Sequence, residues 1–168
     1  MARVSAGELG LDLDHWCFGC GQANPHGLRL DFEFSADRAE SSFTAAREQQ
    51  GYDGMAHGGI LTTLLDEAMG WSALHQGIWG VTTRLAVTFR RPVRLGEEVR
   101  VVGEIVRDRG RALELRGEIR RASDDELIAT AAATYVKMSE AQKRTLMEKY
   151  GEPAQTSQRV TARVRGRE

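Results

Sequence analysis

The sequence is organised around the stretch Met55-Ala56-His57-Gly58-Gly59-Ile60-Leu61-Thr62-Thr63-Leu64-Leu65-Asp66-Glu67-Ala68-Met69-Gly70-Trp71. At about 100° per residue, its large apolar side chains cover roughly half of a helical circumference, which is wider than a surface helix needs. The pattern therefore predicts one long helix wrapped by other structure. We expect the helix to end near Gly77 or Gly80, because glycine commonly ends helices.

The opposite face of this helix is made of small residues around Asp66: Gly59, Thr62, Thr63, Gly70 and Ala73. Small side chains allow another surface to approach closely. A carboxylate on a mostly buried helix is costly unless it is hydrogen-bonded or has a chemical task. Asp66 is therefore the first candidate catalytic residue, and a partly exposed structural aspartate is the alternative. Since no second helix of the chain covers this face, it also predicts an obligate homodimer.

The glycine-rich segment His57-Gly58-Gly59 stands where the helix begins. The first N–H groups of a helix lack intrahelical partners and carry the positive end of its dipole. Glycine lets a ligand carbonyl approach such groups closely, so the segment is a candidate oxyanion site two turns from Asp66. The alternative is that the glycines only permit a tight turn into the helix.

Composition and charge exclude several classes of protein. The chain has 168 residues, of which 41% are hydrophobic, and its formal net charge is -1. This length favours one domain, and the charge excludes a strongly basic nucleic-acid binder. We find no apolar run of about 18 residues and no basic-then-apolar signal pattern, so we expect no membrane partner and a cytoplasmic location.

The N-terminal part contains a Cys-x-x-Cys motif, Cys17-Phe18-Gly19-Cys20. Two nearby thiolates suit a zinc site if two further ligands exist, and His15 and His26 are the only nearby candidates. A redox motif would be followed by a helix, whereas a turn leading into an extended run follows here. We therefore expect turn chemistry and packing, with no metal and no cofactor.

Alternating apolar and polar residues predict strands on both sides of the helix. Two strands precede it, at residues 28–34 and 41–46, and four follow it, around residues 85–89, 99–105, 113–119 and 128–136. One helix followed by an antiparallel meander buries its wide apolar face only if the sheet curls around it. We therefore expect an α+β fold with one antiparallel sheet wrapped on one helix.

The expected domain boundaries follow from this pattern. Residues 1–14 are weakly patterned and predict a loose arm, and residues 15–138 form the domain. Residues 139–150 begin with Ser139-Glu140-Ala141-Gln142, which resembles a capping box and predicts a short helix. Residues 151–168 predict a flexible tail.

Three motifs together resemble the hotdog-fold acyl-CoA thioesterases, specifically their phenylacetate-pathway-like branch. They are Cys17-Phe18-Gly19-Cys20-Gly21 with Asn24-Pro25 and Gly27-Leu28, His57-Gly58-Gly59-Ile60 with Asp66, and Phe89-Arg90-Arg91-Pro92-Val93. The resemblance covers residues 15–138. It implies hydrolysis of acyl-CoA by a homodimer, often paired into a homotetramer, with each active site between two central helices.

The resemblance also implies roles for individual residues. Asp66 would be the nucleophile or general base, and the Gly58 N–H would polarise the thioester carbonyl. Thr82 or Thr83 of the facing subunit would orient water. Some relatives carry Asn or Gln in the loop before the His, where this chain has Gly51 preceded by Gln49 and Gln50.

The chemistry of thioesters agrees with this residue set. A thiolate leaving group has a conjugate acid with a pKa near about 8.5, so its departure needs little help from a general acid. An ionised Asp66 needs no activating base, and the chain has no Gly-x-Ser-x-Gly elbow for a catalytic triad. We interpret His57 as structural or substrate-shaping, with a catalytic base as its alternative role.

Two other functions remain open at this point: a non-catalytic acyl-CoA binding module and a hotdog-fold hydratase or dehydratase. A hydratase needs a histidine and a carboxylate that converge on its substrate, but His57 and Asp66 would lie about 13 Å apart along one helix. For the CoA phosphates we expect Arg90 and Arg91, with Arg109 and Arg111 as second choices and Gly59 beside the substrate.

Overall fold

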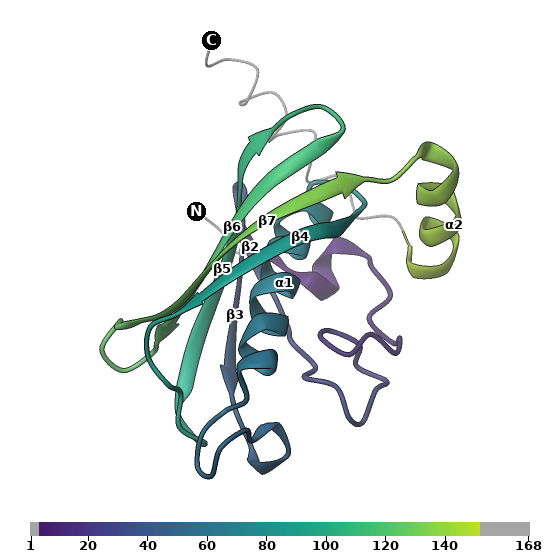
Figure 1. Cartoon of the computed structure of the whole chain (residues 1–168). Helices are drawn as coiled ribbons and strands as arrows, with labels where there is room; N and C mark the ends of the chain where they lie inside the picture. The colour runs from purple at the N-terminus through teal and green to yellow at the C-terminus, as the bar shows by residue number, and fades with distance from the viewer. Residues whose placement is uncertain (1–3, 152–168) are drawn as a thin grey trace.

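The computed structural model describes residues 4–151. The elements follow the predicted order of two strands, one long helix, four further strands and a short helix capped by Ser139, with a short strand added in front (Figure 1). Their bounds are β1 Val4–Ser5, β2 Glu33–Ser35, β3 Arg38–Thr44, α1 Gly58–Leu74, β4 Gly80–Phe89, β5 Glu98–Asp108, β6 Ala112–Arg121, β7 Leu127–Lys137 and α2 Glu140–Tyr150, with short 3-10 turns at Ala6–Leu9 and Arg47–Gln49.

The strands form one sheet in the order β1-β2-β3-β5-β6-β7-β4, and every neighbouring pair is antiparallel. Strands β5, β6, β7 and β4 are 10 or 11 residues long and twist across the molecule, with α1 packed against one face (Figure 1). Within residues 4–151, strand β4 is bonded to β7 alone and forms one edge of the sheet.

Helix α1 provides the centre of the core, as its wide apolar arc predicts. Its buried residues are Leu61, Leu64, Leu65, Ala68, Met69, Trp71, Ser72 and Ala73. The helix ends at Leu74, and Gly77 follows with a φ of 76° in the left-handed region that glycine tolerates. The predicted end near Gly77 is thus three residues late.

The helix lies unusually close to β5 at Gly103. A Cβ atom added at Gly103 would lie 2.2 Å from the backbone carbonyl of Ala68. Only glycine permits this approach, so Gly103 sets the distance between the central helix and the sheet. This distance in turn fixes how far the opposite face of α1, which carries Asp66, stands from the sheet.

The prediction of a loose N-terminal arm over residues 1–14 is wrong for its described part. Val4–Ser5 pairs with β2, and the side chains of Leu9 and Leu11 are buried with exposed fractions of 1% and 8%. The Asp12 N–H donates to the Tyr150 carbonyl at 2.9 Å, which ties this segment to the end of α2. The predicted tail lies outside the described residues except for Gly151.

The strand predicted at residues 28–34 is much shorter in the structure. Leu30 and Phe32 are buried as the alternation requires, but regular pairing is confined to Glu33–Ser35. The N–H groups of Leu28 and Leu30 instead donate to the carbonyls of the Phe18–Gly19 loop. The Cys-x-x-Cys loop therefore takes the place of a neighbouring strand at this point.

Candidate functional site

Asp66 points from the middle of α1 toward the first residues of β4. The Thr82 Oγ1 donates a hydrogen bond to the Asp66 Oδ1 at 2.7 Å, and both side chains are half-buried. The Thr83 hydroxyl donates elsewhere, to the Thr134 carbonyl at 3.2 Å. Of the two predicted threonines, the structure thus brings Thr82 to Asp66, and the contact forms within one chain.

A cavity of about 910 Å³ opens beside Asp66, and we call it the Asp66 cavity. Its wall includes Asp66, Glu67, Gly70, Trp71, Trp79, Thr82 and Tyr135. Burial, followed by the negative charge of Asp66, raises the pKa of Tyr135 to about 12. The phenol therefore stays neutral at ordinary pH. The wall also includes the charged residues Asp12, Asp14 and Lys149.

The first turn of α1 is organised by His57. This residue is the N-cap, and its Nδ1 accepts a hydrogen bond from the Gly59 N–H at 2.8 Å. Ile60 and Leu61 donate to the His57 carbonyl, so the Gly58 N–H is the first-turn amide left without a partner among the described residues. His57 therefore has a capping role, and Gly58 rather than Gly59 is available to bind a carbonyl oxygen.

The Gly58 end of the helix opens on a second cavity, of about 750 Å³, which we call the Gly58 cavity. Its wall includes Gln50, Gly51, His57, Gly58, Phe89, Arg90 and Arg91. A Cβ atom at Gly51 would lie 3.1 Å from the His57 Cα, so that position packs against the cap. Asp66 is absent from this wall, and the predicted carboxylate and amide thus face two different cavities of one chain.

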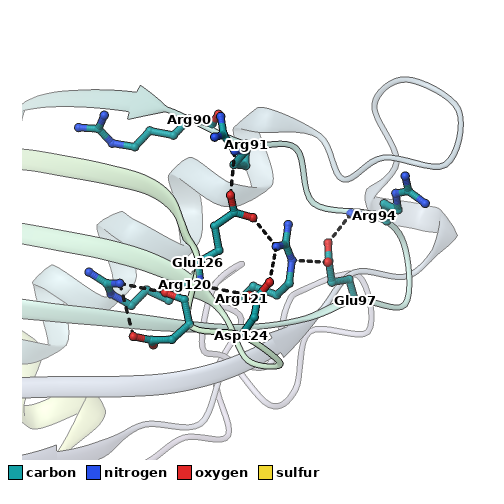
Figure 2. A network of polar contacts seen from close by, with 9 residues as sticks. Arg90, Arg91, Arg94, Glu97, Arg120, Arg121, Asp124 and Glu126 are labelled. Atoms are coloured by element: carbon teal, nitrogen blue, oxygen red, sulfur yellow. Dashed lines mark hydrogen bonds and ion pairs between the residues drawn. The ribbon is translucent and has the colours of Figure 1, made fainter.

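The candidate arginines differ in how they are held. Arg91 pairs with Glu126 at 2.9 Å, and Glu126 also pairs with Arg121 in a network of charges between strand ends. Figure 2 shows Arg90 extended away from this network, and no carboxylate among the described residues forms an ion pair with it. Arg90 is therefore the guanidinium that is free to meet a ligand at the Gly58 cavity.

The second pair of arginines lies elsewhere. Arg109 and Arg111 flank the β5–β6 turn, next to the Ala112 end of β6, whereas Arg90 follows the far end of β4. Arg109 already pairs with Glu114. The structure thus does not bring this pair to the Gly58 cavity of the same chain.

The Asp66 cavity also contains a contact between Glu67 and the two cysteines, which the sequence patterns do not predict. The Cys17 thiol donates to the Glu67 Oε1 at 3.5 Å across 50 residues of sequence, and Cys20 joins them. Burial, followed by the negative charge of Cys17, raises the pKa of Glu67 to about 7. Hydrogen bonding from Cys20 lowers the pKa of Cys17, while that of Cys20 is raised. For Glu67, the only sequence signal of this contact is its position next to the apolar arc of the helix.

The sequence of residues 53–128 matches the family model of the thioesterase superfamily. This segment includes α1, Asp66, Thr82, Arg90 and Arg91. Over this segment the chain is similar to the thioesterase superfamily. It is similar to mouse (Mus musculus) acyl-coenzyme A thioesterase THEM4, with 28% identity over 116 residues, 67% of this chain and 50% of that protein. The chain thus spans about half the length of the curated relatives it matches.

Solved structures agree with the fold. The thioesterase superfamily protein RHA08564 has a TM-score of 0.65 and 27% identity, covering 69% of this chain and 57% of that one. A hypothetical thioesterase from Streptococcus pneumoniae, solved with coenzyme A, has a TM-score of 0.62 and 22% identity. The match covers 66% of this chain and 86% of that one. These likenesses confirm the predicted hotdog thioesterase fold. Within the described residues, no helix has the length and apolarity needed to cross a membrane.

Proposed function

We propose that this protein hydrolyses acyl-CoA thioesters to a free acid and CoA. The observation that carries the proposal is the Asp66 carboxylate, which is held at 2.7 Å by the Thr82 hydroxyl and faces a cavity large enough for an acyl group. The Gly58 amide, which has no partner among the described residues, supplies the complementary donor for a developing oxyanion at the Asp66 of the other subunit. A carboxylate and an oxyanion site are sufficient for a thioester, whose leaving group is stable as a thiolate.

The chemical step begins at Asp66. Its carboxylate either removes a proton from a water molecule that attacks the thioester carbonyl carbon, or attacks that carbon itself to form an anhydride that water then opens. The carbonyl oxygen gains negative charge, which the Gly58 N–H stabilises by donating to it. The C–S bond then breaks, and CoA leaves as a thiolate. Thr82 positions the carboxylate throughout.

The active site forms between two copies of the chain in this proposal. The edge strand β4 has unpaired backbone groups along one side, and long edges of this kind favour strand pairing. Two β4 strands paired antiparallel about a two-fold axis bring the Phe89 end of one next to the Val81 end of the other. The Gly58 cavity of one subunit then meets the Asp66 cavity of its partner. Pairing of dimers into a tetramer remains a prediction.

The nucleotide part of CoA is assigned to the rim of the Gly58 cavity. Arg90 is the main contact to phosphate there, because its guanidinium has no ion pair among the described residues. Arg91 is held by Glu126 and shapes the rim. Arg109, which pairs with Glu114, and its neighbour Arg111 remain second choices for the phosphate contact. They could reach the CoA only from the partner subunit.

Relatives support the same pair of residues. The Streptococcus pneumoniae thioesterase has also been solved with a threonine and, separately, an aspartate replaced by alanine, and the two positions are 16 residues apart. Asp66 and Thr82 have the same separation. We infer that the two pairs correspond. Membership in the phenylacetate-pathway-like branch and a cytoplasmic location also remain predictions.

A panel of short, medium, long and aryl acyl-CoA substrates tests the function. Release of free CoA, followed with a thiol reagent, is the expected result for at least one class. An enoyl chromophore formed without CoA release would favour the hydratase alternative. Saturable binding of acyl-CoA with no release across the whole panel would leave the non-catalytic binding module as the function.

A further inference from the structure

Three metal-ligating side chains converge beside Asp66: Cys17 and Cys20 from the N-terminal loop and Glu67 from α1. Their two sulfur atoms and one carboxylate oxygen all lie within 4.8 Å of one another, and the Cys17 Sγ lies 3.5 Å from the Glu67 Oε1. We propose that these three residues bind one zinc ion. The inference does not depend on the proposed hydrolysis.

The spacing of the ligand atoms fits tetrahedral zinc. With Zn–S near about 2.3 Å and Zn–O near about 2.0 Å, a tetrahedral site separates a sulfur from an oxygen by about 3.5 Å and two sulfurs by about 3.8 Å. The Cys17–Glu67 distance of 3.5 Å already equals the first value. The Cys17–Glu67 pair therefore already has the spacing that zinc requires, and both pairs with Cys20 lie within 4.8 Å.

The loop that carries the cysteines is fitted closely to Glu67. A Cβ atom at Gly19 would lie 2.3 Å from the Glu67 side chain, so glycine lets the loop reach the carboxylate without displacing that side chain. A Cβ atom at Gly21 would lie 2.2 Å from the His15 carbonyl, and the Gly21 N–H donates to the Cys17 carbonyl at 3.0 Å. These contacts close the loop with both sulfurs on the Glu67 side.

The charges in this cluster favour a bound cation. Glu67 is removed from solvent to a large extent, and within residues 4–151 no lysine, arginine or histidine forms an ion pair with it. A carboxylate and thiolates gathered away from water are costly without a compensating positive charge. Two sulfur ligands select zinc over magnesium or calcium, which prefer oxygen.

The proposal departs from the prediction that the two cysteines bind no metal, because the fold adds a third potential ligand. The candidate ligands in the nearby sequence are absent from the cluster, since the His15 Nδ1 accepts from the Cys17 N–H at 3.2 Å and His26 is exposed. The third ligand comes instead from α1, 50 residues further along the chain. The fourth position would face the Asp66 cavity, where water completes the tetrahedron.

The consequence is a metal tether between the N-terminal loop and the middle of α1. Glu67 directly follows Asp66, so zinc would fix the helix segment that carries the proposed catalytic carboxylate. Its positive charge would also neutralise the carboxylate next to Asp66. The zinc ion is assigned a positioning role, because its three ligands join the N-terminal loop to α1.

Metal analysis of the full chain tests the proposal. Protein purified under reducing conditions should contain about one zinc per chain, and stripped protein titrated with Co²⁺ should develop thiolate-to-cobalt charge-transfer and tetrahedral d–d absorption that Zn²⁺ abolishes. Cys17→Ser and Cys20→Ser should each weaken binding by more than about 100-fold, because loss of even an outer-shell partner costs about 10–100-fold. His26→Ala, which changes an exposed histidine in the same segment, should bind normally.

Glu67→Gln provides the variant that keeps both thiols. It should weaken Co²⁺ binding and alter the d–d spectrum while circular dichroism shows an intact fold. Absence of zinc together with absence of a charge-transfer band in reduced, folded protein would overturn the proposal. So would unchanged affinity in Cys17→Ser or Glu67→Gln, or a Cys17–Cys20 disulfide whose reduction yields no metal binding.

Discussion

The position of the Asp66 carboxylate depends on its contact with Thr82. The helix around Asp66 is largely apolar, and a bare carboxylate there would be destabilised by desolvation. The Thr82 hydroxyl donates to it at 2.7 Å and leaves the oxygen of the hydroxyl free to accept from water. A single short contact therefore orients the carboxylate beside the cavity.

The amide of Gly58 can be removed without changing the shape of the helix. Gly58→Pro eliminates the N–H at the first helical position, where proline fits, and His57 has the extended backbone that a residue before proline requires. We expect kcat to fall about 10²-fold, as for loss of one oxyanion donor. Steady-state kinetics on the best acyl-CoA measures this.

Gly58→Ala is the matched control for this change. It keeps the amide, and its Cβ atom would lie 3.5 Å from the Phe89 ring, an ordinary van der Waals contact. We expect near-native kcat. Equal losses in the alanine and proline variants would assign the effect to crowding rather than to the amide.

Replacement of Arg90 and replacement of Arg91 by alanine should have different effects on the KM for acyl-CoA. Arg90→Ala removes an unpaired guanidinium and should raise KM for acyl-CoA about tenfold, equivalent to about 1.4 kcal/mol. Arg91→Ala breaks an exposed pair with Glu126 and should change KM little. A short thioester without the nucleotide should show no Arg90 effect. Equal KM changes for both thioesters would remove the phosphate assignment.

Helical periodicity and cap chemistry are local, so the sequence was sufficient to propose Asp66, His57 and Gly58 as candidate site residues. It could not separate Thr82 from Thr83, since the choice depends on which side of β4 faces α1. Nor could it bring Glu67 to Cys17, which is a contact across 50 residues set by tertiary packing.

At the scale of elements, the packing of α1 on β5 depends on Gly103. Gly103→Ala would force a Cβ atom to within 2.2 Å of helix backbone, which cannot yield without moving α1. We expect the free energy of unfolding to fall by about 3 kcal/mol, as for severe overpacking. Urea denaturation followed by circular dichroism measures the change.

Gly117→Ala is a graded comparison on the neighbouring strand. Its Cβ atom would meet the Leu65 Cδ2 at 3.1 Å and the Met69 Cγ at 3.3 Å, and side-chain ends can shift. A loss of about 1 kcal/mol is expected. If the alanine at position 103 were the better tolerated of the two, the close helix-sheet contact would not be rigid.

The strand and helix order was predictable because each element carries its own period. The secondary-structure predictions were wrong where the structure of a segment depends on its contacts with another segment. Residues 4–14 have little periodicity, yet Leu9 and Leu11 are buried and β1 pairs with β2. Residues 28–30 have a strand pattern, but their amides bond the Phe18–Gly19 loop. Side-chain alternation predicts burial and does not identify the hydrogen-bond partner.

At the scale of the whole molecule, the proposed dimer makes a testable claim about which subunit supplies each group. Asp66→Asn and Gly58→Pro should each be nearly inactive. A mixed dimer of the two would contain one site with both native groups, so co-expression with separate tags should restore about one quarter of native activity in a random mixture. Activity is measured on the doubly tagged fraction and on the mixture.

The same mixing experiment distinguishes the arrangements. If each site used Asp66 and Gly58 of one chain, the mixed dimer would contain no complete site and activity would stay at the level of the parents. A stable, active monomer at micromolar concentration in sedimentation would also contradict the shared site.

The kcat of Asp66→Asn tests the central claim most directly. Asparagine keeps the shape of the side chain and removes the negative charge required for nucleophilic attack or proton abstraction. On the best substrate of the acyl-CoA panel, we predict a loss of about 10²-fold or more in kcat with KM little changed and circular dichroism unaltered. A folded Asp66→Asn protein with near-native kcat would contradict the account.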